Sequence, residues 1–291
     1  MKKQTLPLAY PFDWSGLENF DYSLDANGIP QVYMGKKLGL QYNPITVSQY
    51  GLYHLQKYVP SNDETELKIV QAAAAWLVEN FRDWQRDIGA WVYDYDLEFY
   101  GAKAPWISGM AQGQGISLLL RTYQLAPDDQ ILEITQRAFR AFLHPVSEGG
   151  VTARFPDGSL IFEEFTTETP SLVLNGYIFA LLGILDYAIF WQNSEAQDLF
   201  QIAIRGLIKN LHRYDTGYWN LYDLHPTRRL ASPMYLKVHV QLLRILANLT
   251  GEQVFGEMAD NWLKYLSTPT CRFRWLTGKV LEKIRLLFGK K

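Results

Sequence analysis

Residues 169–187, TPSLVLNGYIFALLGILDY, decide the fold. After its proline the stretch is apolar on nearly every side at helical spacing, and a helix of that kind is buried inside a protein. The proline follows Thr169, a residue type favoured at the N-cap of a helix, and proline itself is well tolerated in a first helical turn. We therefore expect a buried helix that starts near Pro170.

Three further stretches follow the same plan, with a proline just before or inside an apolar run. They are NPITVSQYGLYHL (43–55), APWISGMAQGQGISLLLRTYQL (104–125) and SPMYLKVHVQLLRILANL (232–249). The four prolines, Pro44, Pro105, Pro170 and Pro233, are 61, 65 and 63 residues apart. A second run, polar on one face, follows each of them at 64–81, 128–143, 195–211 and 252–266. A repeat of this length with two helices predicts stacked helical hairpins.

The polarity of the two helix types sets their places in the fold. Helices that are apolar all round belong inside, and helices with one polar face cover them. We predict a mostly α protein: an α/α toroid of four helical hairpins over residues 43–270. Residues 1–42, with DANGIP as a turn, are expected to add a β-hairpin at one edge. Residues 271–291 are expected to form a basic amphipathic tail.

The composition fits a soluble enzyme or binding protein. Of the 291 residues, 48% are hydrophobic and 20% charged, which is ordinary for a globular chain. Aromatic residues reach 14% and suit a surface that stacks on sugar rings. Cys271 is the only cysteine, so the chain cannot form an intrachain disulfide.

Three long connections are the most informative parts of the chain. They cover 82–104, 144–169 and 212–232, and each runs from an outer helix to the next inner one. Long ordered loops in a compact domain usually carry function. Because all three precede an inner helix, we expect them to gather at one end of the toroid. The free N–H groups of the inner helices at that end favour an anion such as a carboxylate.

The acidic residues of these loops have structural as well as functional interpretations. Asp96 and Glu98 fall in the alternating stretch GAWVYDYDLEFYG (89–101), where they can simply be the solvated side of a hairpin. Glu163 and Glu164 come before the third inner helix, where acidic residues also stabilise the helix dipole.

The histidines do not form a metal motif. His225 lies in the third loop, and Tyr235 and His239 share one face of the helix that follows. The sequence has no HExxH, no cysteine cluster and no carboxylate at ligand spacing from His239, so we expect neither a metal nor another cofactor. Gln112, in the second inner helix, is either a sugar-binding side chain or an interhelical contact.

Four motifs together resemble a known family. They are MAQGQGIS (110–117), EEFTTETPSLVLNG (163–176), YDLHP (222–226) and MYLKVHVQLL (234–243). Their order is that of the catalytic helical domain of D-glucuronyl C5-epimerases, which act on heparosan-type polysaccharides. The similarity runs from about Tyr42 to Leu266. It implies an (α/α)4 barrel, in agreement with the four hairpins, and an enzyme that inverts C5 of D-glucuronate to give L-iduronate.

The resemblance assigns roles to particular residues. Tyr222 matches the tyrosine of the family's Tyr-Asp-Leu-Arg motif and Tyr235 the one at the start of the last inner helix, so these are the expected proton carriers. Glu164 matches a glutamate beside the third family tyrosine, but Phe165 stands where that tyrosine is expected. The other expected substrate contacts are Asn175, His225 in place of a family arginine, Arg228 or Arg229 reaching the same space, Gln112 and His239.

Inversion at C5 removes the proton next to a carboxylate and returns one to the opposite face. The two tyrosines are therefore expected to flank the sugar ring, with one phenol made more acidic by nearby positive charge. Three alternatives stay open. They are a polysaccharide lyase using the same intermediate, a glycoside hydrolase using Glu164 with Asp96 or Glu98, and an inactive glycan-binding relative marked by Phe165 and His225.

Charge is divided unevenly along the chain. Residues 271–291 hold seven Lys or Arg against Glu282 alone, so they carry +6 while the rest carries −8. This tail fits a helix on an anionic membrane surface or against a partner, or a last helix that closes the fold. A homodimer is a separate expectation. We expect a uronate-containing polysaccharide or oligosaccharide as ligand and no nucleic acid. Because no signal peptide or membrane-spanning run is evident, the expected location is cytoplasmic, with possible attachment to the inner face of the membrane.

Overall fold

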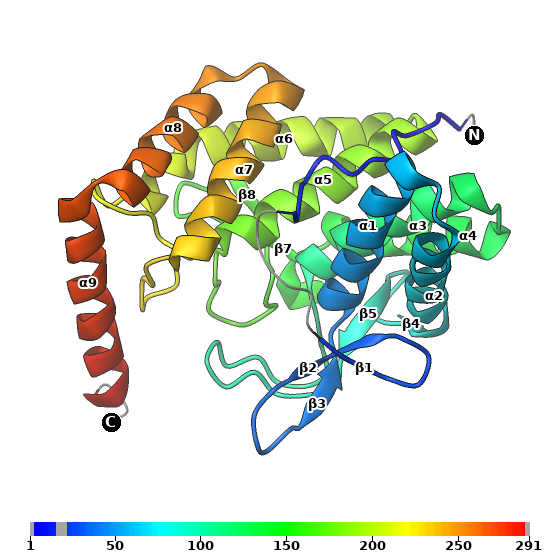
Figure 1. The fold of residues 1–291 in the computed structure, drawn as a ribbon, viewed down its shortest axis with the longest axis horizontal. Coiled ribbons are helices and arrows are strands. Elements are labelled where there is room, and N and C mark those ends of the chain that lie inside the picture. The colour runs from blue at the N-terminus through cyan, green and yellow to red at the C-terminus, as the bar shows by residue number, and fades with distance from the viewer. Residues whose placement is uncertain (1–2, 16–21, 289–291) are drawn as a thin grey trace.

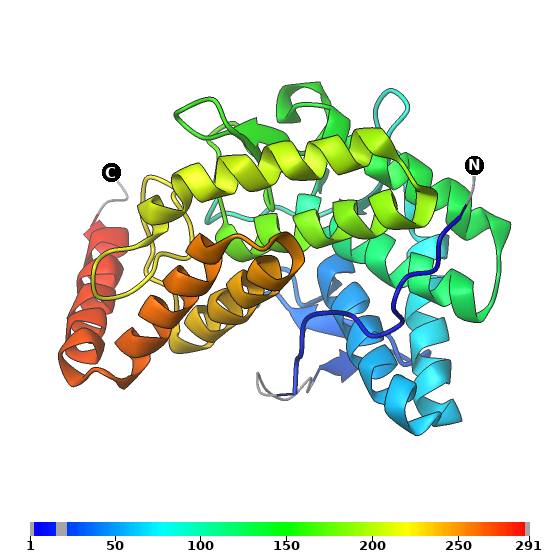
Figure 2. The same cartoon turned by 90° about the horizontal axis from the view of Figure 1, so that it is seen from above.

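The computed structural model describes residues 3–15 and 22–288, and it contains the four predicted helical hairpins (Figure 1). The inner helices are α1 (Pro44–Ser61), α3 (Gly109–Leu125), α5 (Leu174–Trp191) and α7 (Pro233–Thr250). The outer helices are α2 (Glu64–Glu79), α4 (Asp129–Phe139), α6 (Ser194–Asn210) and α8 (Gln253–Ser267). Each inner helix packs against its outer partner, and the hairpins lie side by side around a common centre (Figures 1 and 2). The fold is the α/α toroid that the repeat predicts.

Two of the four inner helices begin where the prolines predict. Pro44 opens α1 behind Asn43, whose side chain accepts from the backbone N–H of Ile45. Pro233 opens α7 behind Ser232, which caps the helix in the same way. These starts follow from local chemistry, because proline needs no N–H partner and Asn or Ser supplies one to its neighbours.

The other two prolines lie ahead of their helices, which corrects the prediction. Helix α3 starts at Gly109, since Trp106 and Ile107 are used as strand β6, paired with β5 (Gly89–Tyr93). Helix α5 starts only at Leu174, because the backbone N–H groups of Ser171 and Leu172 bind the carboxylate of Glu163. A side chain from the preceding loop therefore delays this helix, and the sequence carries no local sign of it.

Helices α3 and α5 cross very closely because glycines face each other. A Cβ atom on Gly183 would lie 2.3 Å from the Cα of Gly113, so neither position accepts a side chain. Helix α5 has the length and hydropathy of a membrane-spanning segment, but 89% of it is buried inside the protein. It is the central core helix of the ring.

The long loops contain short antiparallel strands. One three-stranded sheet has the order β4 (Phe81–Asp83), β5, β6, and a hairpin joins β7 (Thr152–Arg154) to β8 (Leu160–Phe162). Three short 3₁₀ helices cover Arg140–Leu143, Val146–Glu148 and Leu211–Tyr214. These elements stiffen the connections, so the side chains that they carry are held in fixed places.

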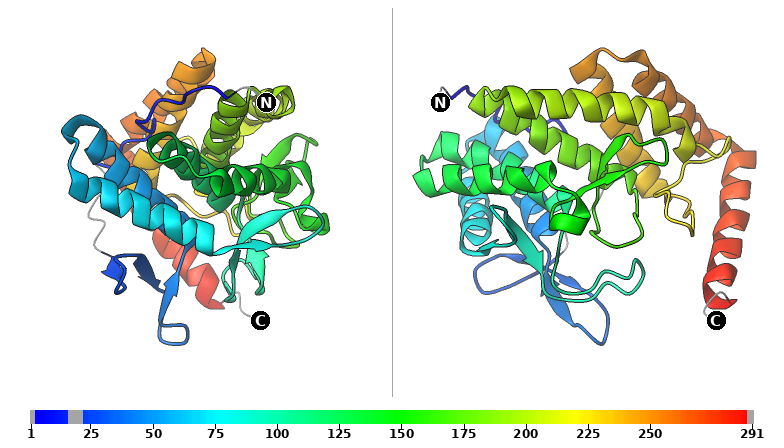
Figure 3. Two further views of the ribbon diagram at one scale, coloured as in Figure 1. Left: turned by 90° about the vertical axis from the view of Figure 1, so that its right-hand side faces the viewer. Right: turned by 180° about the vertical axis from the view of Figure 1, so that it is seen from behind.

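The N-terminal region is more than the predicted hairpin. Its strands β1 (Ser23–Leu24), β2 (Pro30–Tyr33) and β3 (Leu40–Tyr42) form a three-stranded sheet below α1 (Figures 1 and 3). The segment before them runs into the core, where Leu6, Phe12 and Trp14 are buried. The ring of Phe12 packs edge-on against Phe179 of α5, with centroids 5.0 Å apart.

Helix α9 (Pro269–Phe288) ends the described chain and stands out from the helical body (Figure 3). One side of it holds the third loop: Trp275 and Lys279 donate to the carbonyl groups of Ala231 and Leu230, each at 2.9 Å. Its other side is open. The exposed apolar side chains there are Phe273, Leu276, Val280, Leu281 and Ile284. Membrane attachment through this helix, and homodimer formation, remain predictions.

Candidate active site

The N-terminal ends of all four inner helices line one cavity of about 350 Å³, which we call the central cavity. Residues from each helix reach it: Ile45, Thr46 and Gln49 from α1, Met110 from α3, Asn175 and Phe179 from α5, and Met234, Tyr235 and Val238 from α7. Glu164 joins them from the second long loop, and Phe12 and Trp14 from the N-terminal segment. The predicted gathering of loops and helix N-termini at one end of the ring is confirmed.

A second cavity of about 380 Å³, the side cavity, lies next to the first. Its lining residues are Leu97, Phe99, Tyr100, Phe165, Tyr222, Arg229, Leu230, Ser232, Tyr235, Lys279 and Glu282. They come from all three long loops, from α7 and from α9. Tyr235 lines both cavities, so its phenol stands at the boundary between them.

Tyr222 and Tyr235 are brought together, but not in the predicted way. Their ring centroids are 4.6 Å apart with the planes at 69°, and their hydroxyls are hydrogen-bonded to each other. No sugar ring fits between two rings in contact, so the expectation that these phenols flank the sugar is wrong. The two rings therefore form one wall of the side cavity.

Burial dominates the acidity of these phenols. It raises the pKa of both, and the charge of Glu164 adds to the effect. The hydrogen bond between them raises the pKa of Tyr222 further but lowers that of Tyr235, and Arg229 also lowers that of Tyr235. The predicted net lowering by positive charge is therefore not found, because burial outweighs the arginine. Tyr235 is the one of the pair whose phenolate receives such support.

Arg229 occupies an aromatic cage at the wall of the side cavity. Its guanidinium carbon lies 4.2, 4.9 and 4.7 Å from the ring centroids of Phe99, Tyr100 and Tyr222. It forms an ion pair with Asp223 at 2.8 Å, and the carboxylate of Asp223 is fully buried. Burial lowers the pKa of Arg229 to about 10, which leaves it protonated at neutral pH.

Two adjacent glutamates at the third inner helix differ sharply in their surroundings. Glu163 accepts hydrogen bonds from the backbone N–H groups of Ser171 and Leu172 and from the Ser171 hydroxyl. Glu164 lines the central cavity, and its Oε2 has no partner among the described residues. Burial, together with the charges of Glu163 and Asp223, raises the pKa of Glu164 to about 8. At neutral pH Glu164 is therefore mostly a neutral acid that can donate a hydrogen bond.

Asn175 is the second unsatisfied polar group of the central cavity. Its side chain is 3% exposed, and its Oδ1 lacks a partner within the described part of the chain. It stands in the first turn of α5, whose N-cap residue Val173 makes no side-chain cap hydrogen bond. Gly176 beside it leaves room for Glu164, because a Cβ there would lie 2.5 Å from Glu164 Oε2. Buried polar atoms without partners mark the place where a polar ligand group fits.

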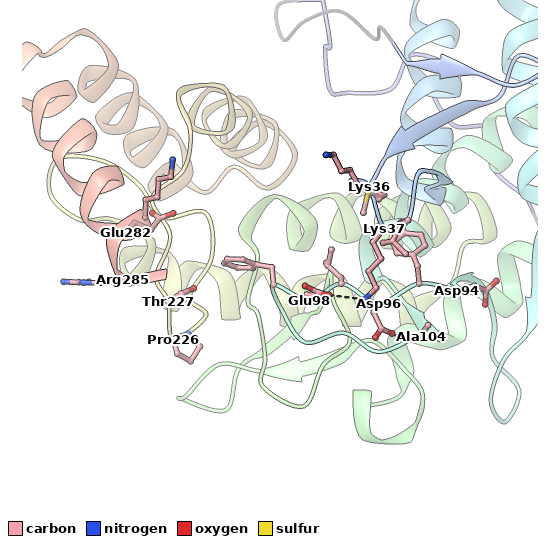
Figure 4. Close-up of a pocket in the computed structure, with 17 residues that line it drawn as sticks. Lys36, Lys37, Asp94, Asp96, Glu98, Ala104, Pro226, Thr227, Glu282 and Arg285 are labelled. Atoms are coloured by element: carbon pink, nitrogen blue, oxygen red, sulfur yellow. Dashed lines mark hydrogen bonds and ion pairs between the residues drawn. The ribbon is translucent and has the colours of Figure 1, made fainter. Parts of the chain in front are cut away.

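A larger cleft of about 1170 Å³ extends from the side cavity toward the surface (Figure 4). Figure 4 shows Lys36 and Lys37 on one wall, with Glu282 and Arg285 of α9 on the other. The loop with Asp94, Asp96 and Glu98 forms the floor between them, and Lys37 pairs with Glu98 at 3.3 Å. Phe99 and Leu97 line both this cleft and the side cavity, so the two spaces are adjacent.

Two of the expected substrate contacts are structural instead. Gln112 is fully buried, donates to the carbonyl groups of Gly89 and Ala138, and accepts from the backbone of Trp91. His239 is also fully buried, contacts Asn220 at 2.5 Å, and has its pKa lowered to about 3 by burial. Neither lines one of the three cavities, because both side chains point into the helical core.

The remaining predicted residues divide into two groups. Arg229 and Phe165 line the side cavity, and Asn175 lines the central one. Arg228 is exposed and lines none of the three, and His225 packs edge-on against Tyr100 with centroids 5.6 Å apart. Of the two arginines that the sequence offered, Arg229 is the one at the site.

Tyr100 is a site residue that the sequence did not reveal. Its ring stacks on Phe165 with centroids 4.3 Å apart and planes at 20°. It lies in the first long loop and reaches the side cavity only because that loop folds back against the second. Its place in an alternating hairpin pattern carried no signal of this contact.

Within residues 3–15 and 22–288, no three His, Cys, Asp or Glu side chains gather into a metal-binding group. The groups placed to do chemistry in the cavities are phenols, carboxyls and an arginine. Phenols and carboxyls of this kind can transfer protons as general acids and bases.

Comparison with known proteins bears on the same residues. Residues 85–264 match the family described as D-glucuronyl C5-epimerase C-terminus. The chain is 34% identical over 215 residues to a D-glucuronyl C5-epimerase of Caenorhabditis elegans, which covers 67% of this chain and 34% of that protein. The chain thus spans about a third of the length of that relative. It is also 25% identical over 244 residues to an uncharacterized protein of Methanocaldococcus jannaschii, covering 78% and 79% of the two chains.

A solved structure supports the architecture. The GH76A α-1,6-mannanase of Salegentibacter sp. HEL1_6 superimposes with a TM-score of 0.54, over 86% of this chain and 67% of that one. At 15% identity the likeness concerns the fold alone. The family match covers more than half of the chain and includes Glu164, Asn175, Tyr222 and Tyr235. On that match, the chain belongs to the D-glucuronyl C5-epimerase C-terminal family.

Proposed function

We propose that this chain inverts C5 of D-glucuronate residues in a heparosan-like polysaccharide, giving L-iduronate. The observation that carries the proposal is the position of Tyr235. Tyr235 lines both the side cavity and a central cavity in which neutral Glu164 and the Nδ2 group of Asn175 can donate hydrogen bonds to a carboxylate. Family membership supports the same chemistry.

The uronate carboxylate is proposed to bind in the central cavity. Glu164, neutral near pH 7, donates a hydrogen bond to it, and the Asn175 amide adds another polar contact. The uncapped N-terminus of α5 contributes a favourable dipole. When the proton leaves C5, negative charge grows on this carboxylate, so donors already in place lower the barrier.

Tyr235 is proposed to exchange a proton with one face of C5. Its phenolate is supported by the hydrogen bond from Tyr222 and by Arg229. Tyr222 thus holds and tunes Tyr235 on the same side of the sugar. The polysaccharide on either side of the reacting glucuronate would continue into the side cavity and the larger cleft.

The hydrolase alternative has less support from the geometry. A glycosidase needs two carboxyl groups on either side of one bond. Asp96 and Glu98 line the larger cleft and pair with Lys103 and Lys37, whereas Glu164 lines the central cavity. A lyase would use the same intermediate as the epimerase, so only the product distinguishes the two reactions.

The test is incubation with heparosan in D2O. An epimerase incorporates deuterium at C5 and produces iduronate signals in the NMR spectrum. A lyase gives an unsaturated product that absorbs in the ultraviolet, and a hydrolase releases reducing ends without deuterium uptake. Binding of the polysaccharide with no exchange at C5 would contradict the proposal and favour a glycan-binding relative.

A further inference from the structure

This inference rests on the proposed function. Inversion needs a proton carrier at each face of C5. Tyr222 and Tyr235 are hydrogen-bonded to each other, so they can serve only one face. Phe165 stands where the family pattern has a tyrosine, and it has no hydroxyl. The second face therefore needs another group.

Tyr100 is placed to be that group. It is 8% exposed, lines the side cavity together with Tyr222 and Tyr235, and stacks face to face on Phe165. Tyr100 and Phe165 come from the first and second long loops, whereas Tyr222 and Tyr235 come from the third loop and α7. The two pairs meet at Arg229, whose guanidinium carbon lies 4.9 Å from the ring centroid of Tyr100 and 4.7 Å from that of Tyr222.

The hydroxyl of Tyr100 has both a proton acceptor and a cation beside it. It donates to Asp223 Oδ2 at 2.8 Å and accepts from Arg229 Nη2. Arg229 is bound to the same Asp223 oxygen through its Nε at 2.9 Å. Transfer of the Tyr100 proton to Asp223 leaves a phenolate against a guanidinium and a neutral carboxyl in a buried place. Burial favours that neutral form, because it raises the pKa of Asp223 to about 7.

We propose that Tyr100 is the proton carrier for the second face of C5, in place of the hydroxyl that Phe165 lacks. In one direction the Tyr100 phenolate takes the C5 proton and becomes a phenol, and the electron pair of the C–H bond passes into the enediolate. The Tyr235 hydroxyl then gives its proton to the opposite face of C5 and becomes a phenolate. Exchange with water resets the two phenols before the next turnover.

The test uses Tyr100→Phe, which keeps the stacked ring and removes only the hydroxyl. Its inversion rate is expected to fall by about 10²-fold or more, the range for loss of a general acid or base. Adding Phe165→Tyr to Tyr100→Phe should raise the inversion rate at least tenfold above that of Tyr100→Phe alone. This is roughly half of the loss on a logarithmic scale. Tyr123→Phe is the matched control, because the Tyr123 hydroxyl accepts from Lys3 and neither residue lines any of the three cavities.

A second readout separates a proton carrier from a structural residue. In the two epimers the C5–H bond points to opposite faces of the sugar. When one carrier is removed, the other can still exchange the C5 hydrogen of the epimer whose C–H bond points toward it. In D2O, Tyr100→Phe should therefore label one epimer without inverting it, and Tyr235→Phe should label the other. A structural defect would slow labelling of both epimers together.

Three results would overturn the assignment. An inversion rate of Tyr100→Phe within about threefold of wild type would show that the hydroxyl is not needed, because loss of an acid–base group has a larger effect. Equal loss of labelling in both epimers, without rescue by Phe165→Tyr, assigns Tyr100 a structural role. Wild-type protein that neither labels nor inverts heparosan contradicts the proposed function itself, and with it this inference.

Discussion

Two buried arginine–aspartate pairs lie at opposite ends of the helical ring and are built differently. At the closed end, Arg121 near the end of α3 binds both oxygens of Asp186 near the end of α5, at 2.5 and 3.1 Å. Ser117 donates to the same carboxylate at 2.6 Å. The side chains of Arg121 and Asp186 are 2% and 11% exposed, so water and ligands hardly reach them.

At the open end, Arg229 binds Asp223 through one oxygen only. The other oxygen of Asp223 lacks a partner within the described part of the chain, and the Arg229 side chain is 23% exposed at a cavity wall. The first pair uses both carboxylate oxygens and only joins two helices. The second pair stands at a cavity wall and shares the Tyr100 hydroxyl. Access to a cavity distinguishes it from the first pair, since each pair has one buried polar atom without a partner in the described part of the chain.

The largest expected effect is on stability, at the closed end. Asp186→Ala leaves the Arg121 charge buried and unpaired, so the free energy of unfolding should fall by ~3–5 kcal/mol. The double variant Arg121→Met/Asp186→Leu should recover most of this, because it removes both charges. Asp223→Ala should cost less, since Arg229 keeps some contact with water. Urea unfolding measures all three, and equal losses for the two aspartate variants would erase the distinction.

The next effect is on catalysis, at the open end. Arg229→Lys keeps the charge but loses the planar fork that binds Asp223 and the Tyr100 hydroxyl. We expect kcat/KM for C5 exchange to fall by about 10²-fold, with the free energy of unfolding changed by no more than ~1 kcal/mol. Arg121→Lys should show the reverse pattern. If Arg229→Lys unfolds the protein without a specific loss of exchange, then Arg229 is structural too.

A pH-dependent effect on stability should extend to higher pH for Glu164 than for Glu163. The pKa of Glu164 is about 8 in the folded protein against an ordinary value of 4.5, so between these values the native state holds a proton that the unfolded chain has lost. This group therefore lowers stability as pH rises through that window. Glu164→Gln removes this effect. Relative to wild type, its free energy of unfolding should therefore increase by up to about 1.4 kcal/mol for each pH unit within the window.

Urea unfolding at pH 5 and pH 8 checks this prediction. Glu163→Gln is the comparison. Burial raises the pKa of Glu163 too, to about 7, so its pH effect should end about one pH unit lower, and loss of an acceptor for Ser171 and Leu172 should destabilise the protein at pH 5 already. If the free energies of unfolding of wild type and Glu164→Gln differ by the same amount at both pH values, Glu164 is ionised throughout.

The smallest effect is expected at Arg228. Its side chain is exposed and lines none of the three cavities, although it is next to Arg229 in sequence. Arg228→Ala should change the free energy of unfolding and the barrier to C5 exchange by no more than ~0.5 kcal/mol. A loss comparable with that of Arg229→Lys would mean that the substrate reaches this side of the loop.

Local chemistry made much of the fold predictable from the sequence. Ser232 and Pro233 set the start of α7, and the all-round apolar pattern of 174–191 placed α5 in the core. The start of α5 was misplaced because Glu163, a side chain from another element, binds the backbone that would otherwise join the helix. Phe12 and Trp14 have no periodic pattern, so their burial against α5 could not be foreseen.

The site was predictable only where a motif named the residue. Tyr222, Tyr235, Glu164 and Asn175 were found through the family pattern, but the contact between the two phenols depends on how the third loop meets α7. Gln112 and His239 looked like ligands because polar residues in apolar helices are conspicuous, whereas here they satisfy buried backbone or side-chain groups. Tyr100 depends on a contact between loops that no spacing encodes.

The central claim is that Tyr235 carries a proton to or from C5. The most direct measurement is deuterium incorporation into heparosan by wild type and Tyr235→Phe, followed by NMR, with folding checked by urea unfolding. The account predicts that the variant folds and binds the polysaccharide but loses inversion by about 10²-fold or more. A folded Tyr235→Phe that inverts C5 at the wild-type rate would contradict it.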